Sequence, residues 1–429
     1  MRVIADLHIH SRYSRATSQN MNVRELARYA QIKGLNLIGT GDFTQPDWVG
    51  ELKSELTEVP GTQLYKPVSI SESQVFFMVT SEVCTIFESD EKAKKIHHVI
   101  LSPSFEIAEQ IMDRLSKYGD MISDGRPVLE MSAAALVEEV IDISRHNVVF
   151  PAHAWTPWFS LFGAFSGFDR LEDCYQDRSQ DIFALETGLS SDPPMNWRLS
   201  ALDRIALISN SDSHSPWPWR IGREANVFEL EEISYTGIID AIRKKDTSRF
   251  LFTIETHPEY GKYHWTGHRS CGVSMSPDEA VKLDNRCPVC KRKLTEGVEQ
   301  RVEELADRPP GFRPEGAVGY RHLLPLHEIV AAVLQIESLS SPTVWKIYNS
   351  LISKFGNEFK VLLEAPLTEL SNVVNPKIAE AIVRVREDRV MVEPGYDGVY
   401  GKLKIFENAE KIGGKETPKS AQAGLESFI

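Results

Sequence analysis

The chain has 429 residues, of which 42% are hydrophobic and 25% are charged, and this composition is typical of a soluble globular protein of about three domains. Its formal net charge of −13 argues against a protein that binds nucleic acid by electrostatic attraction alone. It has no run of about 18 apolar residues and no signal-peptide pattern, so we expect no membrane span. The five cysteines suit a metal site in a reducing compartment better than a disulfide framework.

Residues 1–255 alternate apolar, strand-like runs with helical patterns, which predicts a mainly parallel α/β sheet or barrel. The first helix is predicted to begin after Asn22, with Glu25 three residues further on, and to end at Gly34. A second helix is predicted within 132–147. In such folds, active residues gather at the carboxyl ends of strands. The predicted strands are "LNLIGTG", "VFFMVTSEV", "KIHHVILSP", "NVVFPAHA", "IFALETG" and "RIALISNSDSH".

Three further segments follow this first domain. Residues 256–325 are rich in Gly, Pro, Cys and His with little periodicity, and we expect them to form a small zinc-binding domain. Residues 326–393 have helical periodicity and are predicted to form a C-terminal helical domain. Residues 394–429 are rich in Gly and Lys and are predicted to be a flexible tail.

Two histidines one residue apart follow the first apolar run, in "ADLHIHSRYS", residues 5–14. Side chains alternate faces along a strand, so Asp6, His8 and His10 are expected to point the same way. Asp212 and His214 repeat this spacing in "SNSDSH". Two such pairs at the ends of strands indicate a metal centre rather than an ordinary polar face.

Other predicted strand ends add metal-ligating side chains in "GTGDFT", "VTSEVC" and "FPAHAW". His97 and His98 point to opposite faces if "KIHHVIL" is extended, so one of them is expected to join the centre. Mixtures of imidazole and carboxylate suit zinc, manganese or iron. The additional candidates are Asp42, Glu82 and His153.

The series "DLHIHS … GDF … SE … HH … PAH … NSDSH" resembles the PHP (polymerase and histidinol phosphatase) family of phosphoesterases over residues 1–230. The resemblance implies a distorted (β/α)7 barrel that holds two or three divalent ions, either Zn²⁺ or alternatively Mg²⁺ or Mn²⁺. It also implies hydrolysis of phosphate mono- or diesters by metal-activated water. The ligands that it implies are His8, His10, Asp42, Glu82, His97, His153, Asp212 and His214.

The resemblance also assigns roles within this set. Glu82 and Asp212 are expected to be bridging carboxylates, and groups near His153 or His214 are expected to protonate the leaving group. We therefore take Asp212, Glu82 and His214 as the catalytic candidates.

Two positions need a choice between alternatives. Phe43 stands where the PHP family usually has a histidine ligand, and Asp42 is expected to substitute for it. His97 aligns better than His98 with the family's strand pattern, so His97 is taken as the ligand and His98 as the alternative.

A second metal site is predicted in "HWTGHRSCGV" and "RCPVCKRKL". Two residues separate His268 from Cys271, and after fifteen residues Cys287 and Cys290 follow with the same spacing, as in a zinc ribbon. A closed site of four ligands holds one structural Zn²⁺, and His264 is the alternative to His268. The basic residues around this motif indicate either a surface for the DNA backbone or a solvated run of charges.

Two features near the C-terminus relate to DNA. "LSNVVNPKIAEAIVRVR" resembles a helix–hairpin–helix in which Asn375 and Pro376 replace the usual glycines, so DNA contact and plain helical packing are equally expected. The last eight residues, "QAGLESFI", resemble the peptide by which partners dock on the DNA sliding clamp, PCNA. The expected contact residues of this peptide are Gln422, Leu425, Phe428 and Ile429.

The combination of PHP barrel, zinc ribbon, helical domain and clamp peptide resembles the archaeal endonuclease Q family across essentially the whole chain. The resemblance implies a DNA-repair endonuclease that cuts on the 5′ side of deaminated bases (uracil, hypoxanthine, xanthine) and abasic sites. It also implies PCNA as a partner and a place with the nucleoid in an archaeal cytoplasm. The alternatives are a small-molecule PHP phosphatase, which needs only the barrel, and a non-catalytic zinc-ribbon DNA-binding scaffold, which needs no complete ligand set.

An enzyme that inspects a damaged base extrudes it into a pocket with aromatic walls. "AWTPWFSLFGAFSGFDR" and "SPWPWRIGRE" are dense in aromatic residues and follow ligand-bearing strand ends. These aromatic residues are expected either to wall such a pocket or to cap the barrel mouth. The candidate walls are Trp155, Trp158, Phe159, Trp217 and Trp219, with Arg220 or Arg223 to grip a flanking phosphate.

Overall fold

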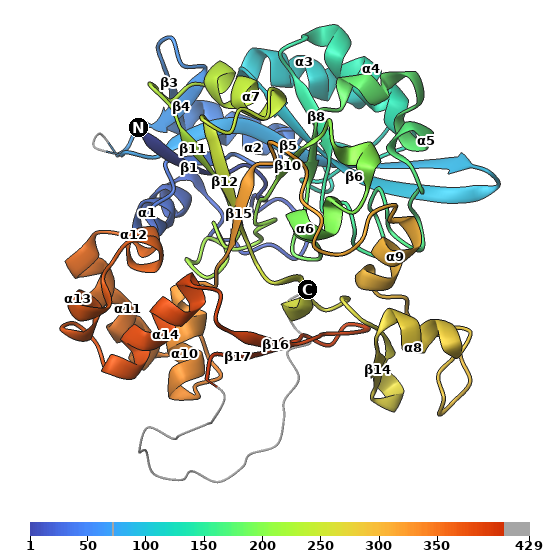
Figure 1. Cartoon of the computed structure of the whole chain (residues 1–429). Helices are drawn as coiled ribbons and strands as arrows, with labels where there is room; N and C mark the ends of the chain where they lie inside the picture. Colours follow the sequence, from blue (N-terminus) through green and yellow to red (C-terminus); the bar gives the residue numbers. More distant parts are fainter. Residues whose placement is uncertain (71–72, 407–429) are drawn as a thin grey trace.

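A mixed sheet of eleven strands forms the centre of the computed structural model, which describes residues 1–70 and 73–406 (Figure 1). Along its main path the strands lie in the order β15 (Gly319–His322), β12 (Phe250–Glu255), β11 (Ala225–Glu229), β1 (Arg2–Asp6), β2 (Leu37–Gly39), β5 (Phe76–Ser89), β4 (Leu64–Pro67) and β3 (Leu56–Val59). Off this path lie β6 (Lys92–Ser102) and β7 (Val128–Leu129), which pair with β5, and β8 (Val148–Pro151), which pairs with β6. A separate pair consists of β9 (Ala184–Glu186) and β10 (Ala206–Ile208).

All six strands expected from the sequence are present, and the two expected helices are α1 (Val23–Lys33) and α4 (Ala133–Ile143). The side chain of Asn22 caps α1 by accepting a hydrogen bond from the backbone N–H of Glu25. Gly34 ends the helix with φ at 97°, a left-handed conformation that glycine adopts without steric cost. The other helices before β12 are α2 (Pro46–Glu55), α3 (Phe105–Leu115), α5 (Leu171–Tyr175), η1 (Gln176–Asp181), α6 (Pro193–Asn196), η2 (Ser200–Leu202) and α7 (Tyr235–Arg243).

The strand pairing is mixed, so the expectation of a mainly parallel sheet is wrong. β1 runs parallel to β2 but antiparallel to β11, and β5 is antiparallel to β6 along its length. Only Asp90 and Glu91 join β5 to β6, and both have positive φ, at 51° and 59°. Such a two-residue hairpin leaves no chain for a helical crossover, which forces the two strands to pair antiparallel.

The β9–β10 pair is joined to the main sheet through backbone hydrogen bonds beyond the strand ends. The N–H of Ala154, after β8, donates to the carbonyl of Glu186 at 3.0 Å. The N–H of His10, after β1, donates to the carbonyl of Ser213 at 2.9 Å, just after β10. The ends of these four strands therefore meet in one place. The fold is mixed α/β, and the seven-stranded barrel stays a prediction.

Short elements follow β12 and form an outlying unit around α8 (Figure 1). Arg301 holds this unit to the main body, since its guanidinium donates to the carbonyls of Phe162 and Phe168. The chain then returns to the main sheet, where β15 pairs parallel with β12. The elements are η3 (Pro258–Tyr260), β13 (Thr266–His268), η4 (Arg269–Cys271), β14 (Val273–Met275), α8 (Pro277–Lys282) and α9 (Val298–Leu305).

Five helices packed on one another follow β15, on the other side of the molecule from α8 (Figure 1). They are α10 (Leu326–Leu334), α11 (Pro342–Phe355), α12 (Glu358–Leu363), α13 (Leu367–Ser371) and α14 (Pro376–Arg386). Asn375 caps α14 by accepting from the N–H of Lys377, so α13 and α14 form two helices joined by a short turn. Among the helices of the described residues, none has the length and apolar character of a membrane span.

The hairpin of β16 (Met391–Glu393) and β17 (Lys402–Lys404) extends from the helices toward the unit around α8 (Figure 1). Residues 394–406 are therefore ordered parts of the fold, and the expectation of a flexible tail from residue 394 is wrong for them. Gly395 and Gly401 allow neighbouring backbone to approach closely. A Cβ added at Gly395 would lie 2.1 Å from the Gly261 carbonyl oxygen, and one added at Gly401 would lie 2.2 Å from the Glu259 carbonyl oxygen. The rest of the predicted tail lies outside the described residues.

A buried ion pair joins the helices to α1. Lys33 is 1% exposed, and its Nζ lies 2.7 Å from Glu358 Oε1 and 2.7 Å from the carbonyl oxygen of Pro218. The other carboxylate oxygen of Glu358 accepts a hydrogen bond from the Tyr348 hydroxyl at 2.9 Å. A buried charge is costly unless it is paired and hydrogen-bonded. This network therefore fixes α12 against α1 and the loop that contains Pro218.

We expect Glu358→Leu to lower the free energy of unfolding by about 3–5 kcal/mol, because it leaves the Lys33 ammonium buried without its partner. Urea unfolding of the full chain measures the change. Lys53→Met is the control, since it breaks an exposed pair with Glu109 that contributes at most about 1 kcal/mol. Equal effects of the two substitutions would contradict the assigned role of the buried pair.

Candidate metal centre

Four ligand-type side chains converge where β1, β5 and β10 approach one another. Atoms of His8, His10, Glu82 and Asp212 all lie within 4.8 Å of one another. The Nε2 atom of His10 is 3.2 Å from both Glu82 Oε2 and Asp212 Oδ1, and the Nε2 atom of His8 is 3.7 Å from the same two oxygens. The predicted alternation of His8 and His10 thus places both imidazoles at one point.

A second group shares Glu82 with the first. Its Oε1 atom lies 2.8 Å from His97 Nδ1 and 3.2 Å from His153 Nε2, whereas Oε2 faces the first group. One carboxylate therefore stands between two sets of imidazoles, each oxygen serving one set. This arrangement suits a carboxylate that is shared between metal ions.

The unsatisfied atoms of the first group show that its residues fit divalent metal ions. His8 Nε2, His10 Nε2 and Asp212 Oδ1 are buried and have no hydrogen-bond partner. Buried polar atoms are nearly always satisfied, so three that face one point indicate a ligand. Imidazole nitrogen and carboxylate oxygen are donors that zinc, manganese and iron accept.

Carboxylates behind His8 and His10, the two histidines that follow β1, fix their rings. The Nδ1 of His8 lies 3.0 Å from the Glu186 carboxylate, and the Nδ1 of His10 lies 3.0 Å from Asp42 Oδ1. In each case a hydrogen bond from Nδ1–H leaves Nε2 as the free donor atom, as in the carboxylate–histidine–metal arrangement. Asp42, expected as a ligand, thus takes a different place in the structure, behind His10.

Glu186 and Arg126 were not found by sequence reasoning. Glu186 ends β9, so the rule of strand-end residues could have identified it. Arg126 lies in a loop and had no such signal; its Nη1 donates to Glu82 Oε2 at 2.9 Å. Burial alone raises the pKa of Glu82, but the charges of His97 and Arg126 outweigh burial and hold the pKa well below its usual value.

Register on the β5–β6 hairpin separates His97 from His98. His97 is opposite Cys84, two residues from Glu82, so it shares the face of Glu82. His98 points to the other face, where it contacts the Thr85 hydroxyl at 2.9 Å. Burial lowers the pKa of His98 to about 3, so it stays neutral. The structure thus brings His97, and not His98, to the second group.

Several residues of the centre have backbone conformations that non-glycine residues rarely adopt. The φ angles of Asp42, His153 and Asp212 are 50°, 30° and 47°. Left-handed conformations of this kind cost energy and are concentrated at functional sites. His214 lies beside this centre, with its ring 4.4 Å from that of His10 and its Nδ1–H donating to the Asp212 carbonyl.

Among the aromatic residues expected to wall a base pocket, Phe159 contacts a residue of the metal centre. Its ring centroid is 5.1 Å from that of His97, and its side chain is partly exposed. The neighbouring Trp158 is 40% exposed and stacks on Phe165, with 4.9 Å between the ring centroids. These rings offer an accessible apolar surface beside the second ligand group.

The other three tryptophans of the expected pocket pack elsewhere. Trp155 is buried, and its Nε1–H donates to Asn196 Oδ1. Trp217 and Trp219 stack on each other, and Trp219 meets Trp345 of α11 edge to face. These three side chains therefore pack against other residues of the fold, and both roles expected for them, as pocket walls or as a cap on the barrel mouth, stay predictions.

The two arginines expected to grip phosphate lie in the loop after Asp212. Arg223 donates from Nε and Nη2 to the carbonyl of Ser211, and burial lowers its pKa. Arg220 is partly buried near Glu328; burial raises the pKa of that carboxyl, and the charge of Arg220 opposes the rise. A role for either arginine in phosphate binding stays a prediction.

The predicted zinc ligands also come together. Atoms of His268, Cys271, Cys287 and Cys290 lie within 4.8 Å of one another, around the β13–β14 hairpin. His264, the alternative ligand, instead lies 3.5 Å from the Glu299 carboxylate. A backbone N–H from Cys290 lowers the pKa of the Cys287 thiol to about 6, which favours the thiolate form that binds metal.

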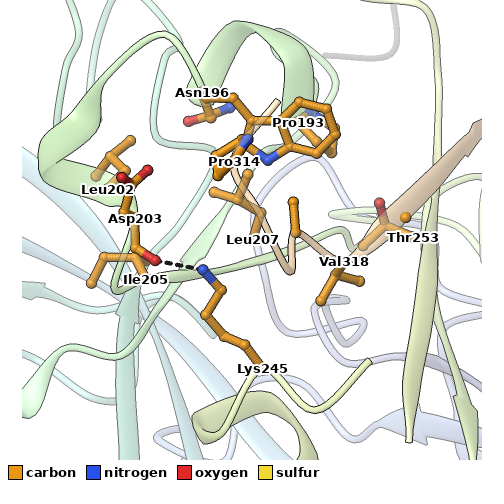
Figure 2. Close-up of a pocket in the computed structure, with 13 residues that line it drawn as sticks. Pro193, Asn196, Leu202, Asp203, Ile205, Leu207, Lys245, Thr253, Pro314 and Val318 are labelled. Carbon is orange, nitrogen blue, oxygen red and sulfur yellow. Dashed lines mark hydrogen bonds between the residues drawn. The ribbon is translucent and has the colours of Figure 1, made fainter. Parts of the chain in front are cut away.

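A small pocket near β10 is separate from these clusters. Figure 2 shows its lining, in which the Lys245 ammonium donates to the carbonyl of Asp203. Its lining contains neither histidine nor cysteine, and none of the lining residues belongs to a ligand group. The pocket is therefore not part of the metal centre.

An α/β fold with two groups of ligand-type side chains joined by one glutamate suits a metal-dependent hydrolase. The chain is similar to the lesion-specific endonuclease PfuEndoQ from Pyrococcus furiosus, with a TM-score of 0.84, 34% identity and coverage of 95% of this chain and 96% of that one. It is similar also to endonuclease Q in complex with a 27-mer duplex that has an abasic lesion at the active site, with a TM-score of 0.83, 33% identity and coverage of 95% and 97%. The chain therefore belongs to the endonuclease Q family, and it is a DNA endonuclease.

The chain is also similar to proteins from two other organisms and to one family model. The Bacillus subtilis protein YqxK is 28% identical over 421 residues, which are 94% of this chain and 99% of YqxK. MJ0043 of Methanocaldococcus jannaschii is 34% identical over 259 residues, which are 58% of this chain but only 31% of that protein. The family model of the MJ0043 C-terminal domain matches residues 325–389, which include α10 to α14.

We expect Glu186→Gln to weaken metal binding by about 10–100-fold, because the charge that orients His8 is lost while the size of the side chain is kept. Metal content after dialysis against a series of chelator concentrations measures the affinity. Glu88→Gln, an exposed change on β5, is the matched control. Unchanged affinity in Glu186→Gln would show that the carboxylate does not support the centre.

We expect Cys287→Ser to lose one zinc ion per chain and to loosen the β13–β14 hairpin, since such small units fold with their metal. Elemental analysis gives the zinc content, and hydrogen exchange locates the loosened backbone. Cys174→Ser, a buried cysteine of α5 outside the cysteine cluster and the metal centre, is the control and should keep all zinc. Full zinc content in Cys287→Ser would refute the structural site.

Proposed function

We propose that the chain is a DNA-repair endonuclease that hydrolyses the phosphodiester 5′ to deaminated bases (uracil, hypoxanthine, xanthine) and abasic sites. The observation that carries this proposal is the shared Glu82 between two ligand groups at the strand ends. The similarity to an endonuclease Q with an abasic lesion at its active site supports the choice of substrate. The complete set of ligands argues against a non-catalytic scaffold, and the family argues against a small-molecule phosphatase.

Each part of the centre has a place in hydrolysis. His8, His10 and Asp212 would hold one divalent ion, His97 and His153 a second, and Glu82 both. Such ions, when bound, lower the pKa of water and neutralise phosphate oxygens. We take Zn²⁺, Mg²⁺ or Mn²⁺ as the ions and a distorted PHP barrel as the frame that holds them.

Two side chains beside the centre complete the chemistry. Arg126 donates one N–H to Glu82 and is partly exposed. Its other N–H groups would therefore be available to a phosphate oxygen. His214 donates from Nδ1–H to the Asp212 carbonyl, so its Nε2 has a lone pair that would accept the proton of the attacking water, and the imidazolium formed in this way would then protonate the leaving oxygen.

We expect Asp212→Asn to reduce nicking of a uracil-containing duplex by at least about a hundred-fold, because it removes the negative charge of a ligand. Gel analysis of the nicked strand, with metal added, gives both the rate and the position of the cut. Asp240→Asn, on the exposed face of α7, should leave the rate unchanged. Nicking at the wild-type rate by Asp212→Asn would rule out this centre as the catalytic site.

We propose that Phe159 and Trp158 contact the extruded base. Their rings are partly exposed, lie beside the second ligand group and follow His153 in the chain. Base–aromatic stacking contributes about 1–3 kcal/mol per base. An abasic site has no base to stack, so the contact distinguishes the two kinds of lesion.

We expect Phe159→Ala to slow cleavage at uracil by about 5–150-fold, which corresponds to this stacking energy, and to leave cleavage at an abasic site nearly unchanged. Single-turnover rates on two duplexes that differ only at the lesion provide the comparison. Phe312→Ala, an exposed phenylalanine outside the centre, is the control. Equal losses on both lesions would contradict a stacking role.

The clamp peptide lies outside the described residues. We propose that Gln422, Leu425, Phe428 and Ile429 dock on PCNA, and the sequence pattern at the end of the chain supports this proposal. Docking would keep the endonuclease on DNA without a direct part in hydrolysis.

A further inference from the structure

A third cluster of ligand-type side chains lies away from both the metal centre and the cysteines. Ligand atoms of His257, His322 and Asp388 all lie within 4.8 Å of one another. His257 follows β12, His322 ends β15, and Asp388 follows α14, so three segments distant in the sequence meet here. We propose that these residues, here named the junction site, bind a divalent transition-metal ion that fixes the end of the helical segment to the main sheet.

The distances between donor atoms fit one ion. Asp388 Oδ1 is 2.9 Å from His257 Nε2, and Asp388 Oδ2 is 3.3 Å from His322 Nδ1. Ligands at about 2.0–2.2 Å from a tetrahedral zinc ion are separated from one another by similar distances. The rings of His257 and His322 are 4.1 Å apart, so their nitrogen atoms reach the same carboxylate.

His322 also has a carboxylate on its opposite nitrogen, since Asp192 Oδ2 is 3.1 Å from His322 Nε2. Glu259 Oε2, at 3.9 Å from His257 Nδ1, lies beyond hydrogen-bond distance. His8 and His10 have the arrangement of His322 with Glu186 and Asp42 in the metal centre, where it aims the free nitrogen at the ligand position. One histidine of the junction site therefore repeats the construction of the metal centre.

The donor set determines the class of ion. Two imidazole nitrogens and one carboxylate oxygen suit Zn²⁺ or a similar transition ion, whereas Mg²⁺ and Ca²⁺ prefer oxygen ligands alone. Asp388 is half exposed, so the ion can enter from solution and complete its coordination with water.

The position of the junction site gives it a structural role. Glu255 and His322 are register partners on β12 and β15, so the two histidines lie at the end of the main sheet. Asp388 lies between α14 and β16, where the chain leaves the helices and enters the hairpin that extends toward the unit around α8. An ion held here would link the sheet, the helices and the hairpin at one point.

Zinc content tests the proposal without use of activity, so its result is independent of the proposed nuclease function. The full chain and its variants are dialysed against buffered Zn²⁺ and analysed for metal per chain. We expect His257→Gln and Asp388→Asn each to contain one zinc ion fewer than the wild type. His146→Gln changes an exposed histidine outside every cluster and should match the wild type.

A double variant separates the junction site from the cysteine cluster. If the sites are independent, His257→Gln combined with Cys287→Ser loses two zinc ions, and crystals of the wild type show an anomalous zinc peak between His257 and Asp388. Wild-type zinc content in both His257→Gln and Asp388→Asn, with no such peak, would overturn the proposal. The cluster would then be an ion-pair network only.

Discussion

The buried carboxylate of Glu82 is the constraint on which the arrangement of the strand ends depends. It is 0% exposed, and a carboxylate in that position is stable only with several positive or hydrogen-bonding partners. Its two oxygens face two sets of imidazoles, and Arg126 donates a hydrogen bond to the Oε2 oxygen. Strands β5 and β6 and the segments after β1, β8 and β10 must therefore deliver their ligands to a common point, which explains the positive φ angles accepted at His153 and Asp212.

Two sets of contacts outside the ligand groups hold the metal centre in place. Glu186 contacts His8 and also accepts hydrogen bonds from the backbone N–H of His153 and from Asn210. Lys33 reaches the carbonyl of Pro218 and Glu358 together, so the helical segment is attached to the loop that follows Asp212. A change in the packing of these helices would therefore alter the position of the loop that follows Asp212, although no residue of these helices belongs to the two ligand groups.

Much of the metal centre could be predicted from the sequence, because the face of a strand is set by a period of two residues. This rule placed His8 and His10 together and explains why only one of His97 and His98 reaches Glu82. The spacing of Cys287 and Cys290 indicated a metal cluster for a similar local reason, since two intervening residues allow both sulfur atoms to face one ion. The six strands, α1 and α4 followed from patterns within single segments of the chain.

Only the tertiary structure decided the features that depend on contacts between distant segments. Asp42 was expected to be a ligand, but the ring of His10 stands in front of it, and no local pattern encodes that order. Arg126 reaches Glu82 from a loop without periodicity. Gly395 and Gly401 looked like parts of a flexible tail, yet they are glycines because neighbouring backbone approaches them too closely for a Cβ. The sequence determined which side chains share a local face, and three-dimensional packing decided which faces meet.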